Sequence, residues 1–499
     1  MVELSSAAPP RLAPIPAADA SIPAVTAIAR YWLRRFSFPL RAGFVLVGLW
    51  ILVQYPDRSP VFLASALPAA LILFQVLPSY HATLPVFPAF LALQALSFTA
   101  PLLNPDLATD WRVQLSANLL SATGLPLLLW FLALWLGWRL TPVRALARRT
   151  LAMPLSNALQ APGSLPHLAL VLMILLQAFL NSPLYWQVLG GLAKGLVAPM
   201  RAVIGLVGLS GAFVGAYCWS RGRLRDSLLW LVLFIVPVLQ SMRSLLLSSL
   251  QGILFAALLG MWLGRARRAL AITIAIILFL SFINSGKVQL REKYWGRGAQ
   301  LPANPIALVQ EWVRASIETR TNPDDQSQDL FTQRFNNLQS LLYVEQQLQS
   351  GTPTLQGASY SVIPEVLVPR LLNPNKVRSQ EGQVLLNLHF SRQRNRESTE
   401  RTYIAWGMLA ESVGNFGRVL GPITVGLLTG CLLRLTENIG RGQHLLSTPG
   451  LLSLALGLLW LSAYEMVYST FSAAAFQVTA AVLLMGWWFG PRSRKATSR

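Results

Sequence analysis

Long apolar segments follow one another along almost the whole chain, with mostly short polar stretches between them. A membrane-spanning helix needs about 20 mostly apolar residues, because about 30 Å of hydrocarbon is crossed at about 1.5 Å per residue. Twelve segments fit this requirement, the seventh and ninth being short: residues 38–55, 60–77, 82–103, 115–138, 165–186, 202–219, 227–240, 244–263, 269–283, 419–435, 451–468 and 471–489. The pattern therefore predicts a polytopic membrane protein.

Basic residues gather at alternate ends of these segments. The clusters are Arg30, Arg34 and Arg35 before the first; Arg139, Arg144, Arg148 and Arg149 after the fourth; Arg221, Arg223 and Arg225 after the sixth; Arg265, Arg267 and Arg268 after the eighth; Arg434 and Arg441 after the tenth; and Arg492, Arg494 and Lys495 after the twelfth. Cytoplasmic loops are the ones enriched in Lys and Arg. All these clusters fall on the cytoplasmic side if both termini are cytoplasmic.

The predicted fold is an all-α polytopic membrane protein with about 12 transmembrane helices and both termini cytoplasmic. The long polar stretch between helices 9 and 10 then lies outside the cytoplasm, and residues 307–320 and 328–349 within it have the apolar spacing of amphipathic helices. The predicted organisation is an Ala/Pro-rich cytoplasmic tail at 1–37, helices 1–9 at 38–283, the extracytoplasmic (periplasmic) loop at 284–401, helices 10–12 at 402–489 and a basic cytoplasmic tail at 490–499.

Composition agrees with a membrane protein and changes the meaning of the charge. The 499 residues are 54% apolar and 12% charged, whereas soluble proteins carry about 25% charged residues. The net charge of +21 would in isolation suggest a nucleic-acid partner. Most of that surplus lies in the predicted cytoplasmic segments, where it faces anionic lipid headgroups. We therefore expect membrane lipids as partners and no nucleic acid.

Familiar soluble-enzyme and metal motifs are absent from the sequence. It has no GxGxxG, GxxxxGK[ST], HExxH or GxSxG, and its two cysteines, Cys218 and Cys431, lie far apart in apolar stretches. Asp324, Asp325 and Asp329 lack the turn glycine and distal glutamate of a calcium loop. The sequence thus predicts neither a metal nor a cofactor.

A proline-rich run in the loop, residues 360–376, is the most specific candidate for binding chemistry. Its three prolines, at 364, 369 and 374, prevent one long helix and fix turns around Arg370 and Lys376. A guanidinium held on a stiff backbone can grip phosphate oxygens in bidentate fashion, and an ammonium adds a point charge. Spacing alone leaves open a phosphate site or a surface loop with solvated cations.

Two further arginines have competing interpretations. Arg334 lies on the second predicted loop helix, where it could bind an anion or extend its side chain to the membrane interface. Arg243 lies near the outer ends of two abutting apolar segments. An arginine near the membrane suggests a functional site, because its burial is expensive. The alternative is that Arg243 only marks the turn between the seventh and eighth helices.

A glycine-rich stretch leads into the tenth helix and carries Glu411, Asn415 and Arg418. Its glycines, at 407, 414, 417 and 421, allow a bent start to that helix. We expect Glu465 near the outer end of the eleventh helix to pair with Arg243 or Arg418. His389 could act as a general base near neutral pH, or be an ordinary surface histidine.

These segments together resemble the Wzy-type oligosaccharide repeat-unit (O-antigen) polymerases. The resemblance rests on short motifs and on a long outer loop after many helices. The matching positions are Ser241, Arg243, Arg334, Phe335, Asn337, Gly357, Tyr360, Pro369, Arg370, Pro374, Lys376, Glu411, Asn415, Phe416 and Gly417.

The resemblance implies a glycosyltransferase that joins repeat units carried on undecaprenyl pyrophosphate, outside the cytoplasm of a bacterial inner membrane, without metal or nucleotide sugar. A chain-length-determining co-polymerase is a candidate partner. The site expected from the residues and the resemblance has pyrophosphate contacts at Arg243, Arg334, Arg370 and Lys376, further substrate contacts at Tyr360, Asn415 and Arg418, and a catalytic base at Glu411 or His389.

Three other functions stay open at this stage. A catalytic His389 would favour a lipid-linked-polysaccharide ligase, since related ligases use a loop histidine. A twelve-helix secondary transporter should have two similar halves and a long cytoplasmic link after its sixth helix. The link here is short and the long insertion follows the ninth helix, which favours the polymerase. The third is a non-catalytic export or assembly subunit.

Overall fold

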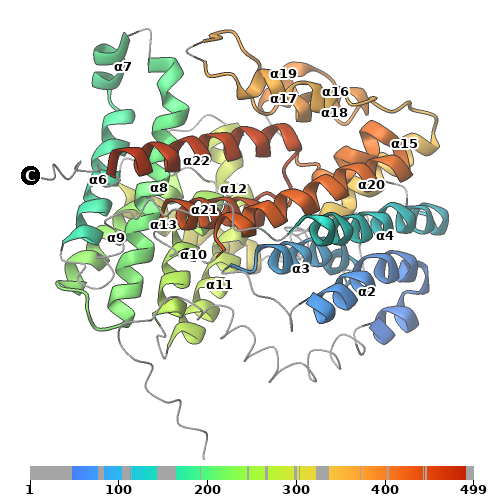
Figure 1. The fold of residues 1–499 in the computed structure, drawn as a ribbon, viewed down its shortest axis with the longest axis horizontal. Helices are drawn as coiled ribbons and strands as arrows, with labels where there is room; N and C mark the ends of the chain where they lie inside the picture. The colour runs from blue at the N-terminus through green and yellow to red at the C-terminus, as the bar shows by residue number, and fades with distance from the viewer. Residues whose placement is uncertain are drawn as a thin grey trace, which may run out of the picture.

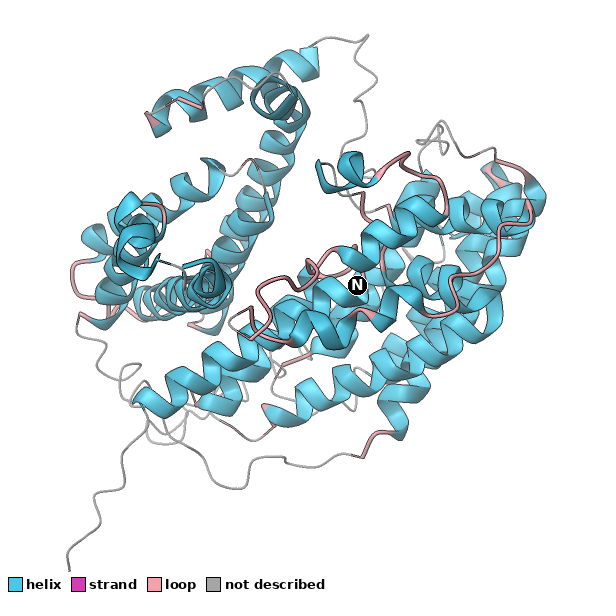
Figure 2. Ribbon diagram, turned by 90° about the horizontal axis from the view of Figure 1, so that it is seen from above, coloured by secondary structure: helices cyan, strands magenta, loops and turns pink. Residues whose placement is uncertain are grey.

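Among the residues that it describes, the computed structural model contains helices and no strands. Those residues are 46, 48–76, 84–103, 113, 115–142, 164–190, 193–243, 245, 247–264, 268–296, 301–302, 304–321, 336–370, 372–401, 404–441, 443 and 447–489. Both predicted tails, half of the first predicted span and Arg334 lie outside them. The helices form two groups (Figures 1 and 2).

The first group joins the beginning of the chain to its end. It consists of α2 (Ser59–Val76), α3 (Val86–Thr99) with the short η3 (Ala100–Leu103), α4 (Ala117–Leu140), α20 (Met408–Ile439) and α21 (Thr448–Ser462), with η1 (Pro56–Arg58) before α2. Helices α4 and α20 touch through their backbones. A Cβ atom on Gly137 would lie 2.1 Å from the Leu427 carbonyl oxygen, and one on Gly430 would lie 2.2 Å from that of Leu134. Small residues at such contacts let two apolar helices pack closely.

The second group holds the middle of the chain (green and yellow in Figure 1). It consists of α6 (Leu165–Leu180), α7 (Pro183–Leu189), α8 (Ala193–Ser220), α9 (Ser227–Arg243), α10 (Leu247–Leu263), α11 (Ala269–Ser285), α12 (Lys287–Arg291), the π-helical η5 (Glu292–Gly296) and α13 (Pro305–Thr321). The last helix that the structure describes, α22 (Tyr468–Phe489), contacts both α21 and α8 and so connects the two groups.

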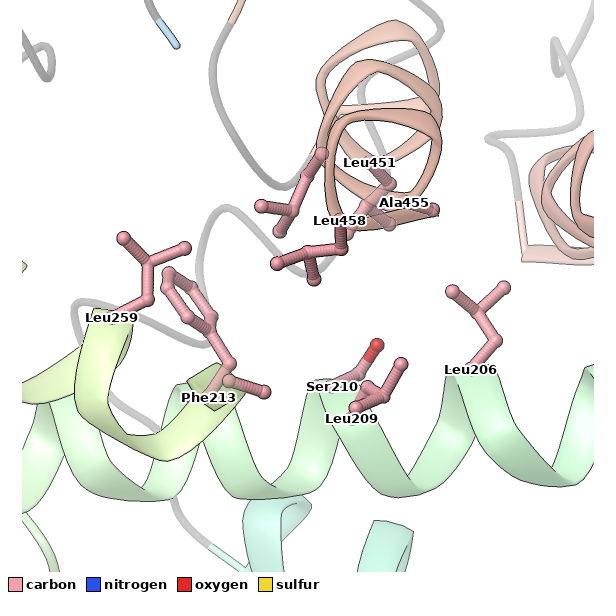
Figure 3. A pocket seen from close by; sticks show the side chains of 10 residues that line it. Leu206, Leu209, Ser210, Phe213, Leu259, Leu451, Ala455 and Leu458 are labelled. Carbon is pink, nitrogen blue, oxygen red and sulfur yellow. The ribbon is translucent and has the colours of Figure 1, made fainter. Parts of the chain in front are cut away.

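A small cavity marks the seam between the two groups (Figure 3). It measures about 30 Å³ and lies where α21 meets α8 and α10. Apolar side chains line it, among them Leu206, Phe213 and Leu458, and Ser210 adds the one hydroxyl of this lining. The lining from these three helices is otherwise apolar.

Four described helices, or five if one bent pair counts once, are long and apolar enough to cross a membrane. They are Pro56–Val76, Ala117–Leu140, Pro199–Ser220, Met408–Ile439 and the bent pair α6 and α7. Other predicted spans coincide with shorter apolar helices, such as α9 and α11. The fifth predicted span, 165–186, was expected to be one helix, but the structure divides it into α6 and α7. It breaks by 76° before Pro183, where Ser182 is extended and the proline ring supplies no N–H.

The long loop between α11 and α20 is also helical. Its helices are α12, α13, α15 (Asn337–Gln349), α16 (Ala358–Ser361), α17 (Ile363–Leu367), α18 (Glu381–His389) and α19 (Arg396–Arg401). Helix α13 corresponds to the predicted amphipathic segment 307–320, and α15 to the part of 328–349 that the structure describes. Helix α15 packs on α3, α4 and α20 of the first group, whereas α13 packs on α9 and α11 of the second group, so the loop contacts both groups.

Helix α20 begins with a sharp kink at Gly417, where φ is +79° and ψ is 178°. Side-chain-bearing residues rarely adopt this backbone region. Past the kink the chain passes close to its own first turns: a Cβ on Gly421 would lie 2.2 Å from the Ser412 carbonyl oxygen. The start of α20 is therefore a separate short helix, which carries Glu411 and Asn415.

Candidate functional site

The structure brings Arg370 and Lys376 together at the edge of one cavity of about 510 Å³, which we call the cation pocket. Arg378 lines the same cavity. The wall from the long helices is mostly apolar: Pro199 and Val203 come from α8, and Ala473, Phe476, Ala480 and Leu484 come from α22, which also contributes Gln477. Cations from the loop thus share one cavity with side chains of two long apolar helices, α8 and α22.

Hydrogen bonds within the loop fix the two cations in place. Lys376 Nζ donates to the carbonyl oxygens of Val366 and Val368, both at 2.7 Å, and so satisfies the C-terminal end of α17. Arg370 Nη1 donates to the Pro374 carbonyl oxygen at 3.2 Å. These bonds leave the ammonium one proton and the guanidinium most of its donors for another acceptor.

Electrostatics at the cation pocket favours an anion. Partial burial, followed by repulsion from Arg370, lowers the pKa of the Lys376 ammonium, against the smaller attraction of Glu365. The Glu365 carboxylate accepts a hydrogen bond from the Val377 N–H at 3.0 Å. Two like charges held together in a partly buried place gain free energy from an anion that neutralises both.

The structure describes one of the two other predicted pyrophosphate contacts, Arg243. Arg243 is exposed at the end of α9 and is not among the residues that line the cavity. The turn that follows it is held by Arg291, whose Nη2 donates to the Leu245 carbonyl oxygen at 2.8 Å. Arg334 lies outside the described residues.

Glu411 lies in a closed hydrogen-bonded group that we call the Glu411 cluster: Glu411, Asn415, Ser359 and the N–H of Tyr468. Glu411 is fully buried, and its two oxygens accept from Ser359 Oγ and from the Tyr468 N–H, each at 2.7 Å. Asn415 Nδ2 donates to Ser359 Oγ at 2.8 Å. The cluster joins α16 to the starts of α20 and α22, which is what a structural carboxylate does.

Tyr360, a predicted substrate contact in α16 of the loop, packs against the starts of α20 and α22. Its ring stacks on Phe416 with centroids 5.5 Å apart and lies 5.7 Å from that of Tyr468. Its buried hydroxyl has no hydrogen-bond partner among the described residues. Burial, followed by the nearby Glu411 carboxylate, raises the pKa of the Tyr360 phenol well above its usual range. The phenol therefore stays neutral and offers an O–H donor.

Arg418 was one of the two expected partners of Glu465, but the structure pairs it with Glu345 of α15 instead. Arg418 Nε lies 2.5 Å from Glu345 Oε2, and the glutamate is fully buried. Neither carboxylate oxygen has a well-aligned hydrogen bond among the described residues. Burial raises the pKa of Glu345 to about 7, and the guanidinium opposes that rise. The pair connects α15 to the residue that follows the kink of α20.

His389, the other predicted base, ends α18. Its Nε2 lies 2.7 Å from the Pro353 carbonyl oxygen, so the imidazole is held by the loop backbone. Its ring meets Phe390 edge to face. It does not line the cation pocket. Among the described residues no group of His, Cys, Asp and Glu is arranged to hold a metal ion.

Sequence reasoning missed Arg378 and Arg392. Arg378 lines the cation pocket, and its position two residues after Lys376 was a usable signal. Arg392 is buried, donates to Ser340 Oγ at 3.1 Å, and lies over the rings of Tyr343 and Trp406. Nothing in its polar local sequence predicts that burial, which the packing of α15 against the segment before α20 creates.

Comparisons of the chain with protein families, with curated proteins and with solved structures find no match.

Proposed function

We propose that this chain is a glycosyltransferase that polymerises oligosaccharide repeat units carried on undecaprenyl pyrophosphate. It would act on the extracytoplasmic side of a bacterial inner membrane, without metal or nucleotide sugar. The sequence motifs that resemble the Wzy-type polymerases support the reaction. The cation pocket supports the substrate class and is the observation that carries the proposal.

The composition of the cation pocket suits a pyrophosphate attached to an apolar tail. Arg370 and Lys376 present donors and positive charge toward one cavity. The α8 and α22 wall presents apolar side chains to the same space. A free sugar or a soluble nucleotide would use the cations and leave the wall uncovered, whereas a lipid-linked pyrophosphate satisfies both.

In the proposed reaction the bond from the anomeric carbon of the growing chain to the pyrophosphate oxygen breaks. The pyrophosphate leaves with the electron pair, and the acceptor hydroxyl oxygen bonds to that carbon while its proton passes to a base. Arg370 and Lys376 would stabilise the charge that develops on the leaving group. The base is left unassigned, because His389 Nε2 contacts the Pro353 carbonyl oxygen away from the cation pocket and both Glu411 oxygens accept internal hydrogen bonds.

The test uses a strain that lacks this gene and carries single variants. We expect Arg370→Ala and Lys376→Ala to reduce long polysaccharide by about 100-fold or more, because each removes a charge from the leaving-group site. Single repeat units should still be made, and protein levels should be unchanged by immunoblot. Arg243→Ala tests the further contact that the sequence predicts.

Arg394→Ala is the matched control, because Arg394 is an exposed arginine of the same loop. It should leave the chain-length ladder unchanged. Normal ladders in both Arg370→Ala and Lys376→Ala would contradict the proposal. Purified protein in proteoliposomes should also lengthen lipid-linked units without nucleotide sugar; movement of units without longer products would favour a transporter.

A further inference from the structure

Arg378 lines the cation pocket but is engaged on its other side by an ion pair. Its Nη1 lies 3.0 Å from Glu400 Oε2 of α19. The guanidinium remains 58% exposed and the glutamate 28%. Arg378 therefore borders both the cavity and a carboxylate outside its lining.

A chain of charges holds that carboxylate in position. Arg396 Nε lies 3.0 Å from Glu400 Oε1, and Arg396 Nη2 lies 2.5 Å from Glu381 Oε2. Glu381 is buried at the start of α18, which anchors the chain. Glu400 thus keeps a cationic partner in Arg396 whether or not Arg378 stays beside it.

The energetics of this pair favours exchange. Ion pairs in contact with solvent contribute little to stability, and the Arg378 guanidinium is mostly exposed, so separating Arg378 from Glu400 costs little free energy. A pyrophosphate bears more than one negative charge and can accept two parallel N–H hydrogen bonds from one guanidinium. Charge-assisted hydrogen bonds of this kind are stronger than those between neutral groups.

We infer that Arg378 is a third anion-binding residue of the cation pocket, and that Glu400 competes with the bound pyrophosphate for its guanidinium. The inference rests on the proposed function for the identity of the anion. In it, Glu400 weakens ligand binding and so favours release of the lipid pyrophosphate after transfer. Arg378 and Glu400 therefore affect binding in opposite directions.

The experiment measures binding of farnesyl pyrophosphate, a short isoprenoid pyrophosphate, to the full-length protein in phosphatidylcholine nanodiscs. We expect Arg378→Ala to weaken binding about tenfold, because a charge-assisted contact is lost. We expect Glu400→Gln to tighten it about threefold, because its competitor is neutralised. The double variant should bind like Arg378→Ala. Farnesol serves to isolate the contribution of the pyrophosphate.

Glu397→Gln is the matched control, since it removes the same charge from the same helix one turn earlier. It should bind like the unmodified protein. Weakened binding in Arg370→Ala and Lys376→Ala, with unchanged binding in Arg378→Ala or in Glu400→Gln, would overturn this inference alone. Unchanged binding in all four would overturn the cation pocket as the anion site, and the inference with it.

Discussion

The cation pocket and the Glu411 cluster differ in how completely their polar groups are satisfied. In the cation pocket, Arg370 and Lys376 are half-buried, lie close enough to repel, and border a cavity. In the Glu411 cluster, Glu411 and Asn415 are fully buried and bonded to the neighbouring elements. Both regions carry residues that the sequence marks as candidates for the same active site.

This difference separates residues that can act on a ligand from residues that hold the loop on the helices. A group with spare donors beside a cavity can bind something from outside. A carboxylate whose oxygens both accept internal bonds has little left to offer, and its removal leaves buried donors unsatisfied. Substitutions in the two regions should therefore fail in different ways.

The largest structural effect should come from Glu411→Ala. It leaves the Ser359 hydroxyl and the Tyr468 N–H buried without their acceptor, which costs about 2–5 kcal/mol of stability. We expect a large fall in the thermal unfolding midpoint in detergent and in protein level. Glu318→Ala, at an exposed loop carboxylate, is the control.

Glu411→Gln tests the catalytic alternative directly. The amide keeps one acceptor but directs a donor at Ser359 or at Tyr468, so partial destabilisation is expected. Full protein level and an unchanged unfolding midpoint, with loss of long polysaccharide, would show that Glu411 acts in the chemistry and would break the comparison.

A smaller effect should appear as pH dependence at Glu345. Its carboxyl has a pKa of about 7 in the folded protein, against a usual value of 4.5. Between these values the folded state binds a proton that the unfolded state lacks, so stability falls as pH rises, by at most about 1.4 kcal/mol per pH unit. Thermal unfolding from pH 4.5 to 7.5 measures it.

Glu345→Gln should remove this slope, because the amide does not titrate. The same variant at pH 5 should unfold close to the unmodified protein, whose Glu345 is then protonated. A slope that persists in Glu345→Gln would assign it to another group.

The smallest structural effect should come from Gly417→Ala. A Cβ there meets nothing within 4 Å, so the penalty is backbone strain alone, about 1–3 kcal/mol. Gly205→Ala on α8 is the matched control, because that Cβ also meets nothing and φ is not positive. The control should be neutral or slightly stabilising. Equal unfolding midpoints for the two variants would show that the kink tolerates an ordinary residue.

Apolar spacing located most helices, because a long run of apolar side chains specifies a helix without reference to its partners. The predicted segments 60–77 and 227–240 differ from α2 and α9 by at most three residues at either end. The break before Pro183 also has a local cause, because the proline that interrupts the helix can be identified in the sequence. Several described apolar helices have only 10–17 residues, whereas a membrane span needs about 20. Their lengths therefore support the prediction of twelve spans only in part.

The candidate site was less predictable, since its geometry depends on contacts between distant segments. The prolines predicted turns around Arg370 and Lys376, and the structure places both residues in the lining of one cavity. No local pattern indicates that Arg418 meets Glu345, or that α8 and α22 line the cavity beside Lys376. Those contacts arise only when the loop packs on helices from both ends of the chain.

The cavity beside Ser210 leaves a gap, lined almost entirely by apolar side chains, between the two helix groups. A single hydroxyl cannot supply the two to four hydrogen-bond partners that an ordered water needs, so this lining holds water poorly. Lipid tails are as apolar as leucine, so no hydrophobic force presses the two sides together in a bilayer. We therefore expect the two helix groups to separate readily at this seam. Distances between spin labels at Leu206 and Leu458 would then have a broad distribution.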